Sequence, residues 1–395
     1  MERVSLILLI IFHLVFVPKS IGQEQIENYD LITVDVTDNY SSQKELVIQD
    51  FMDVEYVPLE TNEEFINQGI VLDITKKYIL VKNENRINDG NIFLYDRTGK
   101  AIRKINHKGQ GGEEYISLYG AILDEANEEM FINDILGRKV LVYDLYGVFK
   151  RSFRNVNSGD IRFYTHIFNY DRHHLICYDE FHKETPFVLI SKQDGKVVRK
   201  IQTPFKEKKF LGQIREGSSG KQSVVGVGPG SYYSIFPFNK NWILSELSSD
   251  IVYYFPTDFS LRPFIKKTPS IQSLNPEIFM VIRLLSERYY FMETIKNVYD
   301  WDSKEGFPRN FFVYDTKEQS FYRYKVYNGD FTTKQEIYIN HTEPVNHEIG
   351  AWYPIEAYQL VESYEKGELK GELKEIASKL DEDSNPVIML LKHKK

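Results

Sequence analysis

Residues 91–105 read NIFLYDRTGKAIRKI, and this stretch has two close copies further along the chain. Residues 139–153 read KVLVYDLYGVFKRSF, and residues 187–201 read FVLISKQDGKVVRKI. Each copy has an alternating apolar strand, a short turn and a second alternating strand, which is the pattern of a β-hairpin. The turn glycine recurs every 48 residues, as Gly99, Gly147 and Gly195. This period predicts one structural unit that is repeated along the chain.

Two further short strands precede each hairpin. They read GIVLDITKKYILVKN at 69–83, GAILDEANEEMFIND at 120–134 and THIFNYDRHHLICYD at 165–179, each with a polar turn in the middle. One unit therefore holds four strands. Two weaker copies follow, and the second carries an insertion, VYDWDSKEGFPR, at 298–309. The aromatic content of 14% also favours sheets, because aromatic side chains suit a half-buried pleated surface.

A sixth unit must be composite. DLITVDVTD at 30–38 and MDVEYVPLE at 52–60 are strand-like but belong to no complete unit, and VIMLLKHKK at 387–395 is a late strand. A ring of sheets must join its ends, since an open edge invites aggregation. We therefore expect an all-β, six-bladed β-propeller of four-stranded antiparallel blades that is closed by an N-terminal strand. The expected blades cover residues 68–116, 117–160, 161–205, 230–270, 277–330 and 335–395, the last completed by a strand from 30–60.

One short helix is predicted within the last blade. The segment LKGELKEIASKL at 369–380 puts four apolar side chains on one helical face. They are Leu369, Leu373, Ile376 and Leu380. A partner-binding helix is one interpretation. A helix packed on the side of the propeller is favoured, because so short a helix needs tertiary support.

The first residues have the features of an export signal. The apolar run Val4–Val17 is too short to span a bilayer comfortably and is typical of a signal-peptide core. The small residues Ser20 and Gly22 then predict cleavage after Gly22, so that 1–22 is a signal peptide. A buried hydrophobic helix or an uncleaved anchor is the alternative.

Cysteine content and charge limit the possible partners. Cys177 is the only cysteine, so an intramolecular disulfide is excluded, and so is a lipid-modified cysteine after the apolar run. We expect an exported protein, periplasmic or secreted, that is not lipid-anchored and has no transmembrane segment in the mature chain. The net charge is −8, and removal of Glu2, Arg3 and Lys19 with the signal makes it −9. Nucleic acid is not expected as a partner, because phosphate binding needs a basic field.

Five segments resemble a known family in their order and spacing. They are EYVPLET at 55–61, LYDRTGKAIRKI at 94–105, GQGGEEY at 109–115, LVYDLYG at 141–147 and LDEDSNPVIMLLK at 380–392. The chain resembles the six-bladed β-propeller family of secreted and lipid-anchored envelope proteins of Gram-negative, Bacteroides-type gut bacteria, whose blades are NHL-repeat-like. The resemblance implies a binding or scaffold protein without a shared catalytic set. Many members have GQGPGEY where this chain has Gly112 and Glu113, and many begin with a lipidated cysteine that this chain lacks.

The stretch HKGQGGEEY at 107–115 raises the question of a phosphate-binding loop. Its glycines are Gly109, Gly111 and Gly112. A phosphate loop leads from a strand into a helix N-terminus, whereas here two carboxylates and then a strand follow. We interpret the stretch as the crossover between two blades, in which the glycines permit positive φ. Tyr115 is expected to pack into the junction, and Glu114 to accept backbone N–H bonds.

The densest potential metal ligands are not expected to converge. They are His166, His173, His174, Cys177 and His182. Alternate residues of a strand point to opposite faces, and DRHHL falls where a hairpin should turn, so that the adjacent histidines point apart into solvent. We expect no metal and no cofactor.

The insertion in the fifth unit is a second candidate site. Asp300, Trp301, Asp302 and Glu305 offer groups for Ca²⁺ or for stacking on a sugar ring. The segment lacks the full calcium-loop pattern, and a solvated loop is the favoured interpretation. The sequence has no GxSxG motif and no histidine placed to pair with a particular serine.

Propellers usually bind ligands where the loops leading into the inner strands meet the central channel. Alignment of the repeats predicts that six residues lie nearest that region: Glu114, Tyr115, Asp134, Arg138, His166 and Tyr178. We expect a non-catalytic binding or scaffold propeller of the cell envelope, with a glycan or another envelope protein as the ligand.

Two alternatives stay open. A lyase or hydrolase at the channel mouth is favoured by three histidines, or by a histidine with carboxylates, whereas aromatic and neutral polar groups favour binding. A structural subunit of an envelope complex is favoured by a large exposed apolar patch. The sequence leaves the oligomeric state unknown.

Overall fold

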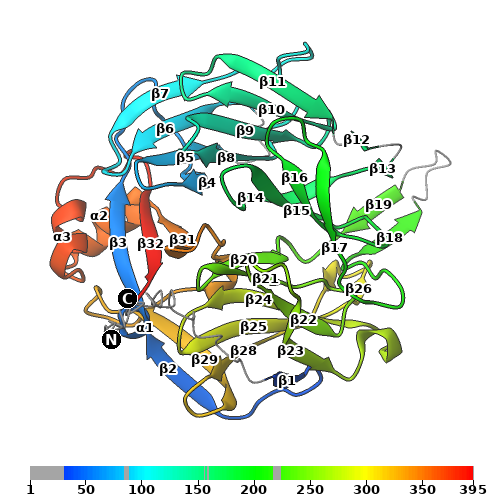
Figure 1. Cartoon of the computed structure of the whole chain (residues 1–395). Helices are drawn as coiled ribbons and strands as arrows, with labels where there is room; N and C mark the ends of the chain where they lie inside the picture. The colour runs from blue at the N-terminus through cyan, green and yellow to red at the C-terminus, as the bar shows by residue number, and fades with distance from the viewer. Residues whose placement is uncertain (1–30, 84–88, 155, 158–159, 217–223, 395) are drawn as a thin grey trace, which may run out of the picture. The chain divides into compact units, whose positions relative to one another are not determined.

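The computed structural model describes residues 31–83, 89–154, 156–157, 160–216 and 224–394. Within this part of the chain, six β-sheets are arranged around a common centre as the blades of a propeller (Figure 1). The predicted fold class is therefore confirmed. The signal peptide expected at 1–22 lies outside the described residues.

Blades I to III have four antiparallel strands each, in chain order from the centre outward. Blade I contains β4 (Ile70–Ile74), β5 (Tyr78–Lys82), β6 (Ile92–Asp96) and β7 (Ala101–Ile105). Blade II contains β8 (Gly120–Asp124), β9 (Glu129–Asp134), β10 (Lys139–Asp144) and β11 (Phe149–Arg154). Blade III contains β14 (Tyr164–Asn169), β15 (His174–Asp179), β16 (Phe187–Ser191) and β17 (Val197–Ile201).

The repeated outer hairpin forms because its turn is fixed locally. In blade I, Asp96 accepts hydrogen bonds from Thr98 N at 2.8 Å and from Gly99 N at 3.0 Å. Gly99 has a φ of 83°, and a Cβ there would lie 2.0 Å from the carbonyl oxygen of Pro58. Glycine is thus required both for the positive φ and for the close approach of the neighbouring chain.

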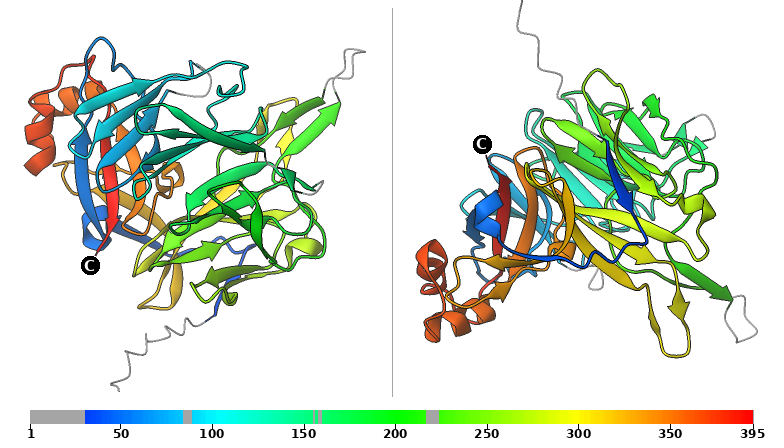
Figure 2. Two further views of the ribbon diagram at one scale, coloured as in Figure 1. Left: turned by 45° about the horizontal axis from the view of Figure 1, so that its top comes forward. Right: turned by 90° about the horizontal axis from the view of Figure 1, so that it is seen from below.

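Blades IV and V each gain a fifth strand from the N-terminal region. Blade IV contains β20 (Ile235–Phe238), β21 (Asn241–Leu244), β22 (Ile251–Phe255) and β23 (Arg262–Thr268), and β1 (Ile32–Asp35) lies parallel to β23. Blade V contains β24 (Ile278–Leu285), β25 (Tyr289–Lys296), β28 (Arg309–Asp315) and β29 (Ser320–Asn328), and β2 (Gln43–Val47) lies parallel to β29. Figure 2 shows β1 beside the strands of blade IV.

Blade VI is composite, as predicted. Its strands are β31 (Ile349–Ile355), β32 (Val387–His393) and β3 (Met52–Pro58), in the order β3-β32-β31. β3 and β32 are antiparallel, with Val54 opposite Leu391 and Tyr56 opposite Met389. The N-terminal strand therefore closes the ring. The blade has three strands instead of the expected four.

Two helices lie outside β3, where the sequence predicts one helix over 369–380 (Figures 1 and 2). They are α2 (Ala357–Glu365) and α3 (Gly371–Ala377). Gly367, just after α2, and Gly371, the first residue of α3, have positive φ values of 71° and 52°, and the chain changes direction between them. Leu369 and Leu373 are buried in the same cluster as Tyr56 of β3. The helix pair thus covers the side of the three-stranded blade.

Short elements complete the described chain. The paired short strands are β12 (Val156–Asn157) with β13 (Asp160–Ile161), β18 (Gln213–Glu216) with β19 (Val224–Val227), and β26 (Tyr299–Asp300) with β27 (Glu305–Gly306). β30 (Gln335–Glu336) pairs with β29. The remaining short helices are α1 (Ile48–Phe51), η1 (Ile271–Ser273) and η2 (Ile339–His341). No helix of the described residues is both long and apolar enough to cross a membrane.

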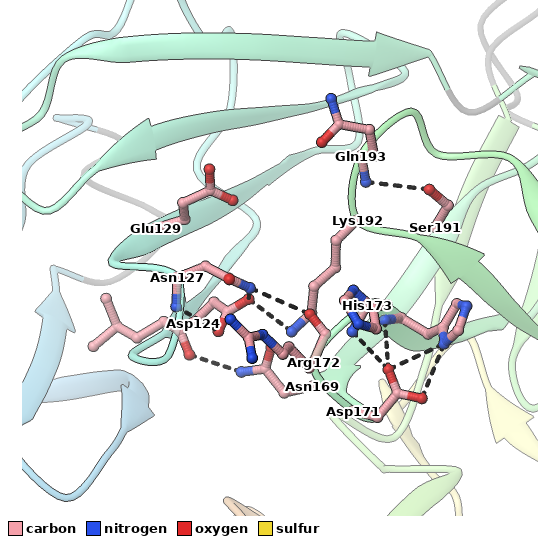
Figure 3. Close-up of polar contacts among 12 residues, drawn as sticks. Asp124, Asn127, Glu129, Asn169, Asp171, Arg172, His173, Ser191, Lys192 and Gln193 are labelled. Carbon is pink, nitrogen blue, oxygen red and sulfur yellow. Dashed lines mark hydrogen bonds and ion pairs between the residues drawn. The ribbon is translucent and has the colours of Figure 1, made fainter.

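Buried polar contacts join neighbouring blades. Between blades II and III, Lys192 Nζ lies 2.7 Å from Asp124 Oδ2, and both side chains are buried (Figure 3). Asn169 Nδ2 donates to the carbonyl oxygen of Leu123 at 2.7 Å (Figure 3). Such contacts fix the position of one blade against the next. Separating the two blades would leave the buried side chains of Lys192 and Asp124 without each other as partners, which would destabilise the fold.

The glycine-rich loop at 107–115 crosses between blades I and II. Tyr115 is fully buried there, and its hydroxyl donates to Gly90 O at 2.5 Å. Glu114 Oε2 accepts from Gly111 N at 2.8 Å. The prediction that the loop glycines adopt positive φ is wrong, because Gly109, Gly111 and Gly112 all have φ values outside that region. A Cβ on Gly109 would instead lie 2.0 Å from the Glu114 carboxylate, so glycine makes room for this side chain.

We predict that Leu390→Ala in β32 lowers the free energy of unfolding by about 2–5 kcal/mol, the usual cost of a cavity at a buried leucine. Leu390 is 0% exposed and packs between blades VI and I. Urea denaturation checks this prediction. The control is Leu136→Ala, since Leu136 is 67% exposed and its truncation should change the value by less than about 0.5 kcal/mol. Equal midpoints for the two variants would show that the closing blade does not belong to the cooperative core.

Candidate functional site

A cavity of about 670 Å³ lies among the inner strands of the propeller. Three of its walls come from the starts of β4, β8 and β14, in blades I, II and III. The other walls are residues 230–233, which lead toward β20, and residues 343–345 with Trp352, from blade VI and its approach. Segments far apart in the sequence therefore meet at this cavity.

Two consecutive tyrosines hold two carboxylates at the cavity wall. The Tyr232 hydroxyl donates to Glu180, which follows β15, and the Tyr233 hydroxyl donates to Glu343 Oε2 at 2.7 Å. Burial raises the pKa of both carboxyl groups. Each carboxyl group thus has a neutral hydroxyl donor beside it, and the tyrosine pair links blade III to the approach to blade VI.

His166 of β14 is held between aromatic rings. Its ring centroid lies 4.7 Å from that of Tyr233 and 5.6 Å from that of Tyr178, at interplanar angles of 22° and 12°. Burial lowers the pKa of His166 to about 4, so the imidazole is neutral at pH 7. Its Nδ1 atom is buried and has no hydrogen-bond partner among the described residues. No hydrogen bond in this part of the chain joins His166 to a carboxylate.

Lys82 is the cation of the cavity wall. Its side chain is almost fully buried, and Nζ donates to Leu118 O at 3.1 Å and to Tyr119 O at 3.2 Å. Burial lowers the pKa of Lys82 to about 8, although the charge of Glu343 acts in the opposite direction. The positive charge is therefore partly satisfied by carbonyl oxygens.

Asp73 of β4 is a third carboxyl group on the wall. Its Oδ2 accepts from Leu123 N at 2.7 Å and its Oδ1 accepts from Ile74 N at 2.8 Å. Burial nevertheless raises the pKa of Asp73 to about 7, because these bonds only partly offset the loss of hydration. The bond to Leu123 also ties the inner strand of blade I to that of blade II.

Aromatic side chains and one amide side chain complete the wall. Tyr119 is 41% exposed, and Phe131, Phe168 and Trp352 also line the cavity. Asn133 is buried, and its Oδ1 atom has no hydrogen-bond partner among the described residues. The cavity thus offers aromatic faces together with hydrogen-bonding groups that carry little net charge.

Of the six residues predicted to lie near the channel, only His166 lines this cavity. Glu114 and Tyr115 fix the crossover between blades I and II. Tyr178 lies behind His166, and its hydroxyl donates to Glu246 Oε2 at 3.1 Å. A binding role for any of these residues stays a prediction.

Asp134 and Arg138 lie at the end of β9 and in the turn after it. Asp134 accepts from Ile116 N at 3.0 Å and from Gly137 N at 2.9 Å, which fixes the crossover from blade I. The Arg138 guanidinium lies 5.3 Å from the ring centroid of Phe163. Neither residue lines the central cavity.

The histidine-rich segment does not form a metal site in the described chain, where no three His, Cys, Asp or Glu side chains form a group that could hold a metal ion. His173 is exposed and lies beside Asp171 (Figure 3). His174 Nδ1 lies 2.9 Å from Asp171 Oδ2. Cys177 is buried inside β15, and His182 Nε2 lies 3.3 Å from Asp160 Oδ1 on the outer surface of blade III.

The insertion in blade V forms the β26–β27 hairpin. Asp300 accepts from Asp302 N at 2.9 Å, and Glu305 is exposed. The guanidinium of Arg215 lies 4.5 Å from the ring centroid of Trp301. The Trp301 ring is thus already in contact with Arg215 of strand β18.

Sequence reasoning missed Asp73, Tyr232, Tyr233 and Glu343. A carboxylate inside the apolar run IVLDI was a visible signal for Asp73, because an inner strand rarely keeps a charge without a role. The other three come from irregular connections in the weakest repeats, where no periodicity marks a cavity-facing position.

Comparison with solved structures found several similar chains. A protein of Bacteroides fragilis that is classed as exported matches with a TM-score of 0.58 and 16% identity, over 93% of this chain and 100% of that chain. A DUF4221 family member from Bacteroides vulgatus matches with a TM-score of 0.47 and 12% identity, over 87% and 96%. Virginiamycin B lyase from Staphylococcus aureus has a TM-score of 0.36 and 9% identity, over 86% and 99%. The last two scores are too low to carry a conclusion about function.

A family model described as a domain of unknown function, DUF4934, matches residues 31–392. The match thus covers all six blades, from β1 to nearly the end of β32. No curated protein gave a significant match.

We predict that Asp73 makes the protein less stable as the pH rises. Its folded pKa of about 7 is above its ordinary value of 3.8, so between these values the folded state keeps a proton that the unfolded chain has lost. The stabilisation that comes from this proton is complete below pH 4 and is lost as the pH rises through 7. The loss is at most about 1.4 kcal/mol for each unit by which the folded pKa exceeds the unfolded pKa. Urea midpoints at pH 4.5 and 7.5 measure it.

The comparison is with Asp73→Asn, which does not titrate and should lose less stability between these two pH values than the wild type. Asp302→Asn, on the exposed insertion, is the matched control. The same pH dependence in the wild type and in Asp73→Asn would contradict the raised pKa.

Proposed function

We propose that this chain, which belongs to the family described as a domain of unknown function (DUF4934), is a non-catalytic binding propeller of the cell envelope that holds a glycan in its central cavity. The cavity volume of about 670 Å³ is in the usual range for small-molecule sites. The observation that carries the proposal is the pair of tyrosine–glutamate hydrogen bonds on a wall that also carries aromatic side chains.

The chemistry of the wall suits a sugar. Sugar rings have apolar faces, which pack on aromatic rings such as Tyr119 and Trp352, and many hydroxyl groups, which need both donors and acceptors. Glu180 and Glu343 supply acceptors, and the unpartnered Oδ1 of Asn133 supplies another. His166 cannot act as an acid at neutral pH, because it is already neutral. Binding is therefore favoured over catalysis.

An exported location agrees with this role. The leader expected at 1–22 and the similarity to a Bacteroides protein classed as exported support a periplasmic or secreted protein. The single cysteine, Cys177, is buried in β15, which supports a protein without a lipid anchor. An NHL-like origin of the blades belongs to the same proposal.

A glycan array tests the proposal. We expect the wild-type protein to bind at least one oligosaccharide, and Tyr119→Ala to weaken that binding at least tenfold, which equals about 1.4 kcal/mol. Tyr119 is partly exposed, so its truncation should leave the fold intact. Tyr146→Ala is the matched control, since Tyr146 is 72% exposed and does not line the cavity.

Binding that is equally weak in both tyrosine variants would place the site elsewhere. If the array shows no binding and an envelope protein is captured from extract through the cavity residues, the ligand is a protein and the glycan proposal fails. Intrinsic fluorescence gives a second readout, because Trp352 lines the cavity.

A hydrolase or lyase is the second candidate, favoured by one observation. A general base works best when its pKa is near the working pH, and the pKa of Asp73 is about 7. Both oxygens of Asp73 already accept backbone amides, which is why this candidate comes second. Cleavage of a bound oligosaccharide by the wild type that is lost in Asp73→Asn would favour the enzyme, and an intact oligosaccharide after prolonged incubation would exclude it.

A further inference from the structure

A second cavity adjoins the central one. Its volume is about 410 Å³, and it extends toward blade V. Four residues line both cavities: Gly230, Ser231, Tyr233 and Glu343. The two cavities therefore adjoin at the Tyr233–Glu343 pair.

Two arginines line the second cavity and share one carboxylate. Arg283 of β24 and Arg309 of β28 both bond to Glu293 of β25, whose side chain is 0% exposed. Arg283 Nη2 lies 2.5 Å and Arg309 Nη1 lies 3.1 Å from the same oxygen, Oε1. Two cations thus share the carboxylate of Glu293, and the charge of Arg283 also acts on Glu343, which lines both cavities.

Backbone carbonyls hold the two guanidinium groups in place. Arg283 Nη1 donates to Ser231 O at 2.8 Å, and Arg309 Nη2 donates to Pro229 O. A guanidinium has five N–H donors in a fixed plane, so these contacts leave donors on both groups for a further acceptor. A planar carboxylate matches such a donor set, because its two oxygens can accept parallel N–H bonds.

The surroundings agree with a positive site. Besides burial, the charges of Arg283 and Arg309 lower the pKa of His341, which also lines this cavity. Asn340 adds an amide to the wall. Glu343 is the one carboxyl group among the four residues that line both cavities, and it accepts a hydrogen bond from the Tyr233 hydroxyl at 2.7 Å.

We propose that the Arg283–Arg309 cavity is a carboxylate subsite, so that the ligand of this propeller is an acidic glycan with a hexuronic acid unit. The neutral part of the sugar lies against the aromatic wall of the central cavity, and its carboxylate lies against the two guanidinium groups. This inference rests on the proposed function and names the class of glycan.

Calorimetry with two trisaccharides tests the inference. The probes are trigalacturonate and neutral galactotriose, each titrated into the wild-type protein at low and at physiological salt. We expect trigalacturonate to bind at least tenfold more tightly, and Arg309→Gln to reduce this ratio to about one. Arg309→Lys keeps the charge but loses the planar donor set, and should give an intermediate ratio.

Lys379→Gln is the matched control, because it removes one exposed positive charge outside both cavities and should leave the ratio unchanged. Equal affinity of the wild type for the two sugars, or a ratio that survives in Arg309→Gln, would overturn the acidic subsite and leave the proposed function standing. Absence of binding by both sugars would also overturn the acidic subsite, whereas the proposed function fails only if the glycan array shows no binding. If the arginine variants do not fold, the wild-type protein still tests the acidic subsite. Its affinity ratio for trigalacturonate over galactotriose should decrease from low to physiological salt.

Discussion

The pairing of β3 with β32 is the constraint on which the rest of the propeller depends. Blades I to III are each built from one continuous stretch of chain, whereas blade VI needs strands from both ends of the described chain. Seven residue pairs run along this junction. The Tyr56 hydroxyl extends the junction to blade V, since it donates to Asp330 Oδ2 at 2.8 Å. Closure positions the inner strands around one centre, and residues of β4, β8 and β14 form part of the wall of the central cavity.

Burial inside this closed ring explains why the central cavity is polar yet weakly charged. Loss of hydration disfavours every charged form, so the carboxyl pKa values rise while those of Lys82 and His166 fall. The adjoining cavity differs, because an arginine stays charged in any protein environment. The two cavities therefore differ in the chemistry of their walls. Tyr233 and Glu343 lie at the boundary between them.

The sequence predicts the blades well because a hairpin turn is local chemistry. Gly99 and its two counterparts are needed for positive φ, and a regular spacing of such turns predicts a regular fold. The closing strand was predictable by elimination, since a ring cannot end on half a blade. The cavity was harder: His166 came from the alignment of repeats, but Tyr232 and Glu343 lie in irregular segments that tertiary structure alone brings together. Local pattern carries no information about which distant segments will meet.

The parallel strands β1 and β2 and the closing strand β3 have a consequence for biogenesis. Glu55 and Lys392 are in contact although 337 residues separate them. Bringing such distant positions together costs about 5 kcal/mol of chain entropy, which later contacts must offset. A nascent chain therefore cannot pair β3 with its partner until β32 has emerged from the ribosome. Until then, the edge of β3 that pairs with β32 is open to other chains, and a holding chaperone that covers it would suppress aggregation during synthesis.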